Sequence, residues 1–194
     1  MAASGASFRP HATTRPVPTL ENAFGSPSQS AYVDAILGEL GDREPLGVLA
    51  ATPDALAEAT AGLNDADARQ RERPGKWSVQ HVVRHLGDSE IVSGYRFRLI
   101  VAHDRPTIAG YDQDLFADRL HYLDATLAET LGDFAAVRGV NVRFLRRLSE
   151  DELARAGMHA ERGEETAERL VKLMAGHDLV HLRQIARIRE TLGV

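Results

Sequence analysis

The chain has 194 residues, enough for one domain of ordinary size with a substantial core. Its formal net charge is -5, and its basic residues are not concentrated as binding to a nucleic-acid backbone requires, so nucleic acid is not an expected partner. The absence of cysteine excludes disulfides, thiolate metal sites and a cysteine nucleophile, and it leaves histidine and carboxylate as the strong metal ligands.

The N-terminal residues differ in composition from the rest of the chain. Four of the eight prolines lie in the first 27 residues, and no periodic apolar pattern begins before Ala31. We therefore interpret residues 1–29 as a tail, mobile or draped on the surface, and residues 30–194 as the folded domain. The tail lacks the apolar segment of a secretion signal, and no later stretch has the roughly 20 consecutive apolar residues of a membrane-spanning helix. A soluble, cytoplasmic protein without a membrane partner is expected.

Helical periodicity begins with Tyr32, Ile36 and Leu40, which lie one turn apart and predict a first helix. Gly and Pro residues follow directly and should end it. A shorter helix is predicted to begin at Pro53 and to run to about Leu63, because proline suits the first turn of a helix. The polar run after it is a connection that ends in a Pro-Gly pair.

Three long amphipathic helices follow, at residues 78–102, 127–149 and 166–192. Ser78 and Thr166 are suitable N-caps for the first and the last of them. Apolar residues at helical spacing mark the inner faces: Val79, Val83, Leu86, Phe97, Leu127, Leu131, Phe134, Leu145, Leu170, Met174, Ile185 and Ile188.

Two connections between these helices are long. Residues 106–120 contain the Pro, Gly and Asp of a structured loop with one short turn of helix, and they resemble a lid. Residues 158–165 predict a second loop. No segment alternates apolar and polar residues for long enough to predict a strand. The three long helices and the shorter first helix therefore predict an all-α fold, a four-helix bundle.

The last long helix carries two histidines, His177 and His181, in the middle of its apolar face. Two imidazoles at positions i and i+4 can reach one metal ion. The alternative is a pair of core histidines that bond to neighbouring carbonyl groups, and the helical pattern leaves both interpretations open. Protons should compete with a metal ion below about pH 6.5, where free imidazoles become charged.

A third ligand would come from the helix at residues 78–102, which carries His81 and His85. His85 lies on the flank of the inner face and His81 points mostly away, so we choose His85. Glu90 is better centred on that face than either histidine. A buried carboxylate needs a partner, which makes Glu90 a candidate metal ligand, a supporting group or the catalytic general base. The alternative is a structural Glu that bonds to a buried Arg.

Two stretches, GKWSVQHVVRHLGDSE at residues 75–90 and AGHDLVHLRQI at residues 175–185, resemble the signature regions of the DinB/YfiT-like superfamily of metal-dependent four-helix-bundle proteins. The family pattern is a Trp-Ser helix start, a His eight residues after the Trp, and a late His-x-x-x-His. These positions are occupied by Trp77, His85, His177 and His181. The resemblance covers residues 31–192 and leaves the tail outside.

The resemblance implies a divalent metal ion, Zn²⁺ or Ni²⁺, held by His85, His177 and His181 with water in the open positions. It also implies an enzyme that acts on a small molecule, either as a hydrolase or as a transferase or isomerase that uses a low-molecular-weight thiol. The alternative is a non-catalytic metal-binding or ligand-binding bundle, which a fourth protein ligand would favour. A homodimer is a further hypothesis, because small bundles with an apolar outer strip commonly dimerise.

A zinc protease is disfavoured, because Asp178 stands where a zincin helix needs Glu and no histidine follows His181. Asp178 lies off the centre of the apolar stripe and is expected to be solvated or bonded to a neighbouring helix.

Three more polar residues fall on inner faces. Arg138 and Asn141 lie on the apolar stripe of the helix at residues 127–149, where they either line a substrate pocket, with Arg138 pairing an anion, or reach Glu90 across the core. Gln184 lies near His181 and could orient it as a supporting residue.

Overall fold

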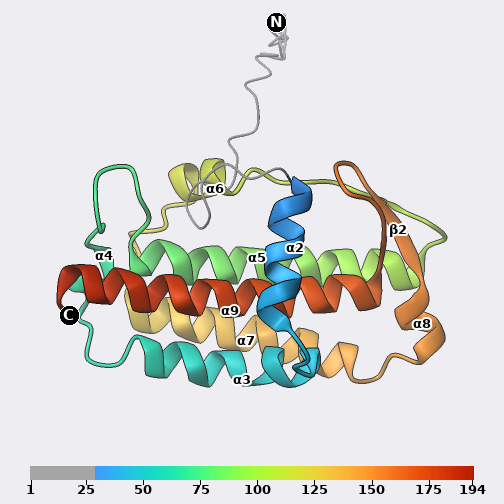
Figure 1. Ribbon diagram of the computed structural model, residues 1–194, viewed down its shortest axis with the longest axis horizontal. Coiled ribbons are helices and arrows are strands. Elements are labelled where there is room, and N and C mark those ends of the chain that lie inside the picture. Colours follow the sequence, from blue (N-terminus) through green and yellow to red (C-terminus); the bar gives the residue numbers. More distant parts are fainter. Residues whose placement is uncertain (1–28) are drawn as a thin grey trace, which may run out of the picture.

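The computed structural model describes residues 29–194, so residues 1–28 of the predicted N-terminal tail lie outside the described part. Four helices form the bundle (Figure 1): α3 at Pro45–Ala59, α5 at Val79–Ala102, α7 at Leu127–Leu145 and α9 at Ala167–Leu192. The helices α7 and α9 each pack against both α3 and α5. This arrangement confirms the predicted helical bundle.

The first described helix, α2 at Gln29–Leu40, is not one of the bundle helices. It crosses the outside of α9 (Figure 1), and its contacts there include an apolar cluster of Val33, Ile36, Leu173 and Val180. The prediction that the first helix completes the bundle was wrong, because α3 takes that place. One apolar residue per turn marks a buried face, but it does not show which helix covers that face.

The crossing of α2 over α9 depends on Gly176, which directly precedes His177. A Cβ atom at this position would overlap the carbonyl oxygen of Ile36 and would lie 2.7 Å from its Cγ2 atom. Because a backbone carbonyl cannot rotate away as a side chain can, a larger residue would have to push α2 outwards. The small residue therefore sets how closely α2 approaches the part of α9 that carries the histidines.

Gly176→Ala is expected to lower the free energy of unfolding by about 1–3 kcal/mol, as overpacking usually does, although alanine is the better helix former. Gly132→Ala is the matched control, since Gly132 lies inside α7 with open space at its Cβ position. That change should raise the free energy of unfolding by about 0.5–1 kcal/mol. Urea denaturation of both variants measures the two effects, and an equal gain in both would contradict the close crossing.

The helix α3 begins at Pro45, well before the predicted start at Pro53. Glu44 caps it by accepting hydrogen bonds from backbone N–H groups of the first turn. Pro53 lies inside the helix, where it has no N–H to donate to the carbonyl group of Leu49. Nη1 of Arg138 donates to that carbonyl oxygen at 2.9 Å. The predicted start was wrong because an arginine from another helix satisfies the group that the proline leaves free.

The helices α5 and α9 begin where the sequence predicts. Ser78 caps α5 and Thr166 caps α9, each by accepting a hydrogen bond from a backbone N–H of the first turn. The helix α7 ends at Leu145, before its predicted end at Ser149. Ser149 instead caps the next short helix, α8 at Glu150–Ala154.

Short elements fill the connections between the long helices. They are α4 at Asp65–Arg69, β1 at Thr107–Ile108, α6 at Gln113–Arg119, β2 at Ala156–His159 and β3 at Gly163–Thr166. The strand β1 pairs parallel with β2, and β2 pairs antiparallel with β3. The prediction of a bare loop at residues 158–165 was wrong, because strands this short cannot show a period-two pattern. The elements β1 and α6 come from the segment predicted as a structured loop.

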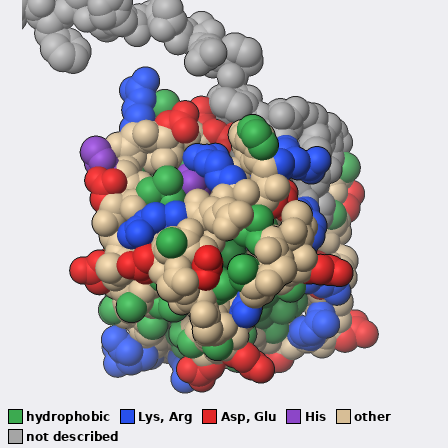
Figure 2. Space-filling view, turned by 90° about the vertical axis from the view of Figure 1, so that its left-hand side faces the viewer, with side chains coloured by type: hydrophobic (Ala, Val, Ile, Leu, Met, Phe, Trp, Pro, Cys, Tyr) green, Lys and Arg blue, Asp and Glu red, His purple; other side chains and the backbone are tan. Residues whose placement is uncertain are grey.

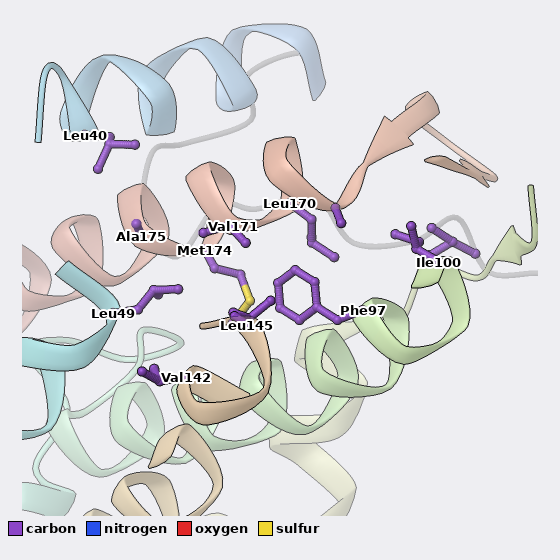
Figure 3. Close-up of a cluster of buried hydrophobic side chains, with 12 residues drawn as sticks. Leu40, Leu49, Phe97, Ile100, Val142, Leu145, Leu170, Val171, Met174 and Ala175 are labelled. Atoms are coloured by element: carbon purple, nitrogen blue, oxygen red, sulfur yellow. The ribbon is translucent and has the colours of Figure 1, made fainter. Parts of the chain in front are cut away.

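A layer of buried polar side chains separates two apolar clusters along the bundle. One cluster includes Phe97 of α5 and Met174 of α9 (Figure 3), and the other includes Val83 of α5 and Ile185 of α9. The buried polar side chains between them come from all four bundle helices: Thr52, His85, Ser89, Glu90, Arg138, Asn141, Asp178 and His181. The residues that the sequence singles out therefore share one layer.

The outer surface is charged with both signs. At the end of the molecule where α9 finishes, Lys and Arg side chains lie among Asp and Glu side chains (Figure 2). In residues 29–194, no helix combines the length and the apolar character that crossing a membrane would require.

Candidate metal centre

Three histidines converge in the polar layer. His177 and His181 lie one turn apart on α9, and His85 comes from α5. The Nε2 atom of His177 lies 3.1 Å from Nε2 of His85 and 3.0 Å from Nε2 of His181. Within residues 29–194, these side chains form the one group whose ligand atoms lie closely enough together to hold a metal ion. The structure therefore brings together the three histidines chosen from the sequence.

The two separations that involve Nε2 of His177 fit a shared metal ion. Two nitrogens that each lie about 2.0–2.1 Å from one ion, at angles of about 90–110°, are about 2.9–3.4 Å apart. Without an ion, Nε2 of His177 would have to satisfy two other ring nitrogens with at most one proton. Imidazole nitrogen is also a preferred ligand of Zn²⁺ and Ni²⁺. The donor atoms and their spacing therefore suit such an ion.

Neighbouring side chains orient two of the rings. Nδ1–H of His181 donates to Oε1 of Gln184 at 2.7 Å, which leaves Nε2 without a proton and able to act as a ligand. The indole of Trp77 stacks on His181 and tilts against His85, with ring centroids 6.5 and 4.9 Å apart. Nδ1 of His85 is buried and finds no hydrogen-bond partner in the part of the chain that the structure describes. Gln184 thus makes the supporting contact that its spacing suggested.

His81, the other histidine of α5, has a different environment. Its Nδ1 lies 2.7 Å from Oγ of Ser78 in the helix cap, and its Nε2 lies 3.0 Å from Nη2 of Arg71. His81 is buried, but it is not a member of the histidine cluster. The helical wheel and the family pattern favoured His85, and the structure places His85 beside His177.

Glu90 lies in the same polar layer but outside the histidine cluster. Its Oε2 accepts a hydrogen bond from Nε of Arg138 at 2.8 Å, and its Oε1 accepts one from Nδ2 of Asn141 at 2.9 Å. Burial raises the pKa of Glu90, and the Arg138 charge and the Asn141 amide oppose that rise. The sequence left open whether Glu90 is a general base or a structural residue that bonds to a buried Arg. The structure shows the bond to a buried Arg, and the catalytic role of Glu90 stays a prediction.

Arg138 connects all four bundle helices. It bonds to Glu90 of α5, and its Nη1 and Nη2 donate to the carboxylate of Asp178 on α9 at 2.6 and 3.2 Å. It also donates to the Leu49 carbonyl of α3, and Asp178 accepts a further hydrogen bond from Thr52 of α3 at 2.8 Å. Asp178 is therefore bonded to neighbouring helices and is not solvated.

Two residues beside the cluster were not predicted. Ser89 lies one turn after His85 on α5, and its Oγ is 3.4 Å from Nε2 of His85. The same Oγ lies 2.6 Å from the hydroxyl group of Tyr111, which belongs to the segment between β1 and α6. The spacing of four residues from His85 was a usable signal for Ser89. No periodic pattern marks Tyr111, because it lies in a loop.

Burial determines how the three histidines are protonated in the metal-free protein. It lowers the pKa of His85 and of His177 well below 6.5, and neighbouring rings add to both shifts. It also lowers the pKa of His181 to about 4. The rings therefore stay neutral, as metal binding requires, at pH values below the 6.5 expected from free imidazole.

The metal-free protein is expected to lose stability as the pH falls from about 6.5 towards 4. In that range the unfolded chain binds protons that the buried rings do not, so the free energy of unfolding decreases with falling pH. For His181 alone the change is roughly 3 kcal/mol. Urea denaturation of the chelated protein across this range measures it, and His181→Gln should flatten the profile. A flat profile for the unsubstituted protein would contradict the burial of neutral rings.

Comparison with known proteins places this geometry in a family context. A family model described as the DinB superfamily matches residues 49–185, a segment that contains all three histidines. Two relatives bear the name "Putative metal-dependent hydrolase". One is YfiT of Bacillus subtilis (strain 168), which is 28% identical over an alignment of 150 residues that covers 75% of this chain and 83% of that protein. The other comes from Bacillus mycoides (strain KBAB4) and is 30% identical over an alignment of 169 residues that covers 85% of this chain and 94% of the relative.

A solved structure of YfiT from Bacillus subtilis, described as having "an unusual four-helix bundle topology", is similar to this fold. The TM-score is 0.72 at 26% sequence identity, and the match covers 77% of this chain and 86% of that chain. The similarity therefore extends over the bundle and not only over the short motifs.

Proposed function

We propose, because this chain belongs to the DinB superfamily, that it is a metal-dependent enzyme acting on a small molecule at the three-histidine centre. The observation that carries the proposal is the convergence of the Nε2 atoms of His85, His177 and His181 in the polar layer of the bundle. The relatives named as hydrolases favour hydrolysis over a thiol-dependent transferase or isomerase reaction.

The centre suits one divalent ion, Zn²⁺ or Ni²⁺. In residues 29–194 no fourth histidine or carboxylate joins the three rings, so ligand positions are left for a substrate. An ion bound there would supply Lewis-acid polarisation of a substrate oxygen. Four protein ligands would have favoured the alternative, a structural and non-catalytic metal site.

The surrounding side chains have separate roles in this proposal. Gln184 holds the ring that it bonds in one tautomer, and Trp77 packs against His85 and limits the access of water. The hydroxyl group of Ser89 lies beside Nε2 of His85 and contacts the hydroxyl group of Tyr111, and the two hydroxyl groups can bind a polar group of the substrate. Burial raises the pKa of Tyr111, so its hydroxyl keeps its proton and can donate a hydrogen bond.

Elemental analysis of protein purified without a nickel column tests the centre. We expect about one divalent ion per chain, because three nitrogens converge on one position. Chelation should lower the melting temperature without unfolding the chain, since metal binding adds stability to a bundle that already has its own core. Absence of metal, with no uptake of added Zn²⁺ or Ni²⁺, would refute the centre. An unfolded chelated chain would show a structural metal instead.

Hydrolysis of a panel of small carboxylic esters and amides tests the catalytic part of the proposal. The metal-loaded protein should release acid from members of the panel without added thiol, and chelation should stop the release. Turnover that requires a low-molecular-weight thiol would favour the transferase or isomerase alternative. Metal binding without turnover of any member would favour the non-catalytic bundle.

A further inference from the structure

Arg96, on α5 beyond the metal centre, is a buried cation without an ion-pair partner. Its side chain is 7% exposed, and no carboxylate in residues 29–194 forms a salt bridge with it. Its Nη2 donates to the carbonyl oxygen of Ala109 at 2.7 Å, while its Nε–H is buried without a hydrogen-bond partner in that part of the chain. Such a group is unfavourable unless water or a ligand completes its surroundings.

His159 of β2 supplies a second open donor. It is 3% exposed, and its Nδ1 accepts a hydrogen bond from the backbone N–H of Glu161 at 3.2 Å. In a neutral ring the proton therefore resides on Nε2, which is buried and has no partner among the described residues. Burial, followed by the charges of Arg162 and Arg96, lowers the pKa of His159 to about 4, so the ring is neutral near pH 7.

Two arginines and two glutamates surround these donors, and of the two arginines only Arg162 forms a salt bridge among the described residues. Arg162 donates both Nε–H and Nη2–H to the carboxylate of Glu165, at 2.9 and 2.7 Å, so this pair is neutral as a whole. Arg96 has no such partner, and Glu161 is an additional negative charge nearby. Nε–H of Arg96 and Nε2–H of His159 are two open donors beside a guanidinium that forms no salt bridge within residues 29–194, and they suit a group with a single negative charge and two acceptor oxygens. A carboxylate meets this description, whereas a phosphate dianion would bring excess negative charge.

A chain of contacts connects Arg96 with the metal centre. The guanidinium lies over the ring of Tyr111, 5.8 Å from its centroid. The Tyr111 hydroxyl lies 2.6 Å from Oγ of Ser89, and that oxygen lies 3.4 Å from Nε2 of His85. Along α5, His85 and Arg96 are separated by roughly 16 Å of helix axis, and long side chains lean back towards the helix N-terminus. A molecule of metabolite size can span the distance between the two places.

We propose that Nε–H of Arg96 and Nε2–H of His159 bind a carboxylate group of the substrate, while its reacting group lies at the three histidines. The strand β2, which carries His159, packs against α5, which carries Arg96 (Figure 1). The substrate class is thus a small carboxylic acid with a second, reactive group. The reaction assigned to this acid rests on the proposed function, but the binding of the anion does not require a metal.

An NMR titration with sodium acetate tests the subsite. The full-length protein carries nitrogen-15-labelled arginine, so the Nε–H group of Arg96 is observed directly. The resonance of Arg96 is assigned as the one that is missing from the spectrum of the Arg96→Lys variant. Acetate should shift this resonance in a saturable manner, and neither acetamide nor sodium chloride should do so. The shift should persist in His177→Ala, which separates anion binding from the metal centre. His159→Leu should weaken acetate binding about fivefold, through loss of one well-placed donor.

Arg84 is the matched control for this experiment. Its Nε is also buried and without a partner, but its Nη1 forms a salt bridge with Asp133 at 3.1 Å. Its resonance should not respond to acetate. A response of Arg96 that does not saturate, or that chloride or acetamide reproduces, would overturn the proposal, as would an equal response of Arg84. These outcomes leave the metal centre untouched, because metal analysis and the ester panel test it separately.

Discussion

Substitution of His177 or His181 by alanine is expected to abolish metal binding by the protein. Each change removes one of three ligand nitrogens, and the described residues provide no fourth histidine or carboxylate to replace it. The fall in affinity should exceed the roughly 10–100-fold loss that follows removal of a residue supporting a ligand. Competition of each variant with a zinc-binding dye measures the affinity, and unchanged binding in either variant would refute the centre.

A comparison of His85→Ala with His81→Ala makes the test specific for the orientation of α5. Both residues are buried and lie one turn apart on the same helix. His85→Ala should lose the metal, whereas His81→Ala should keep it and lose only the stability provided by the contacts with Ser78 and Arg71, about 1–2 kcal/mol. Loss of the metal in His81→Ala together with its retention in His85→Ala would mean that α5 presents another face to α9.

Gln184→Ala provides an intermediate case. It removes the acceptor of Nδ1–H of His181 but leaves all three ligand nitrogens in place. Metal affinity should fall by about 10–100-fold without being abolished. A complete loss would show that the residue is itself part of the ligand set.

The three histidines could be chosen from the sequence because each lies on a helix whose buried face is visible in the apolar spacing. His177 and His181 lie in the centre of such a face, and the wheel places them correctly. His85 lies on a flank of its helix, where the helical wheel alone does not show whether the side chain faces a neighbouring helix or water. The family pattern therefore decided the choice of His85 over His81. The burial of Glu90 was equally visible, but its bond to Arg138 depends on which helices are neighbours.

The errors in the predicted fold have the same cause. The sequence predicts a helix start at Pro53 because proline suits the first turn, whereas inside a helix it leaves a carbonyl group unsatisfied. The donor that satisfies this group, Arg138, is distant in the sequence, and only the packed bundle brings it to Leu49. The place of α2 outside the bundle likewise depends on contact with Gly176, which a search for apolar periodicity does not detect.

Arg138→Met is expected to lower the free energy of unfolding by about 3–5 kcal/mol, the usual effect of removing one partner of a buried ion pair. Arg138 is 1% exposed, and it pairs with Glu90 at 2.8 Å and with Asp178 at 2.6 Å. Methionine has a similar length but no charge, so the variant would leave two buried carboxylates without their cation. Urea denaturation of the metal-loaded protein at about pH 7.5 measures the change.

The surface pair of Arg84 and Asp133 is the matched control. It joins the same two helices, α5 and α7, at 3.1 Å, but its side chains are 27% and 68% exposed. Water and salt screen such a pair, so Asp133→Ala should change the free energy of unfolding by at most about 1 kcal/mol. Similar losses in Arg138→Met and Asp133→Ala would mean that the buried group is not the central link of the bundle.

The pH dependence of the Arg138→Met loss identifies its cause. In the unsubstituted protein burial raises the pKa of Glu90, and the guanidinium opposes that rise. Without the guanidinium the pKa of folded Glu90 should rise further, so the folded variant keeps a proton that the unfolded chain releases above about pH 4.3. Stability of the variant should therefore fall as the pH rises from about 4 towards that raised pKa, and its deficit relative to the unsubstituted protein should be smaller at about pH 4.5 than at 7.5. If the stability deficit of the variant does not change with pH, the loss comes from packing and from the freed Leu49 carbonyl, and not from unpaired charge.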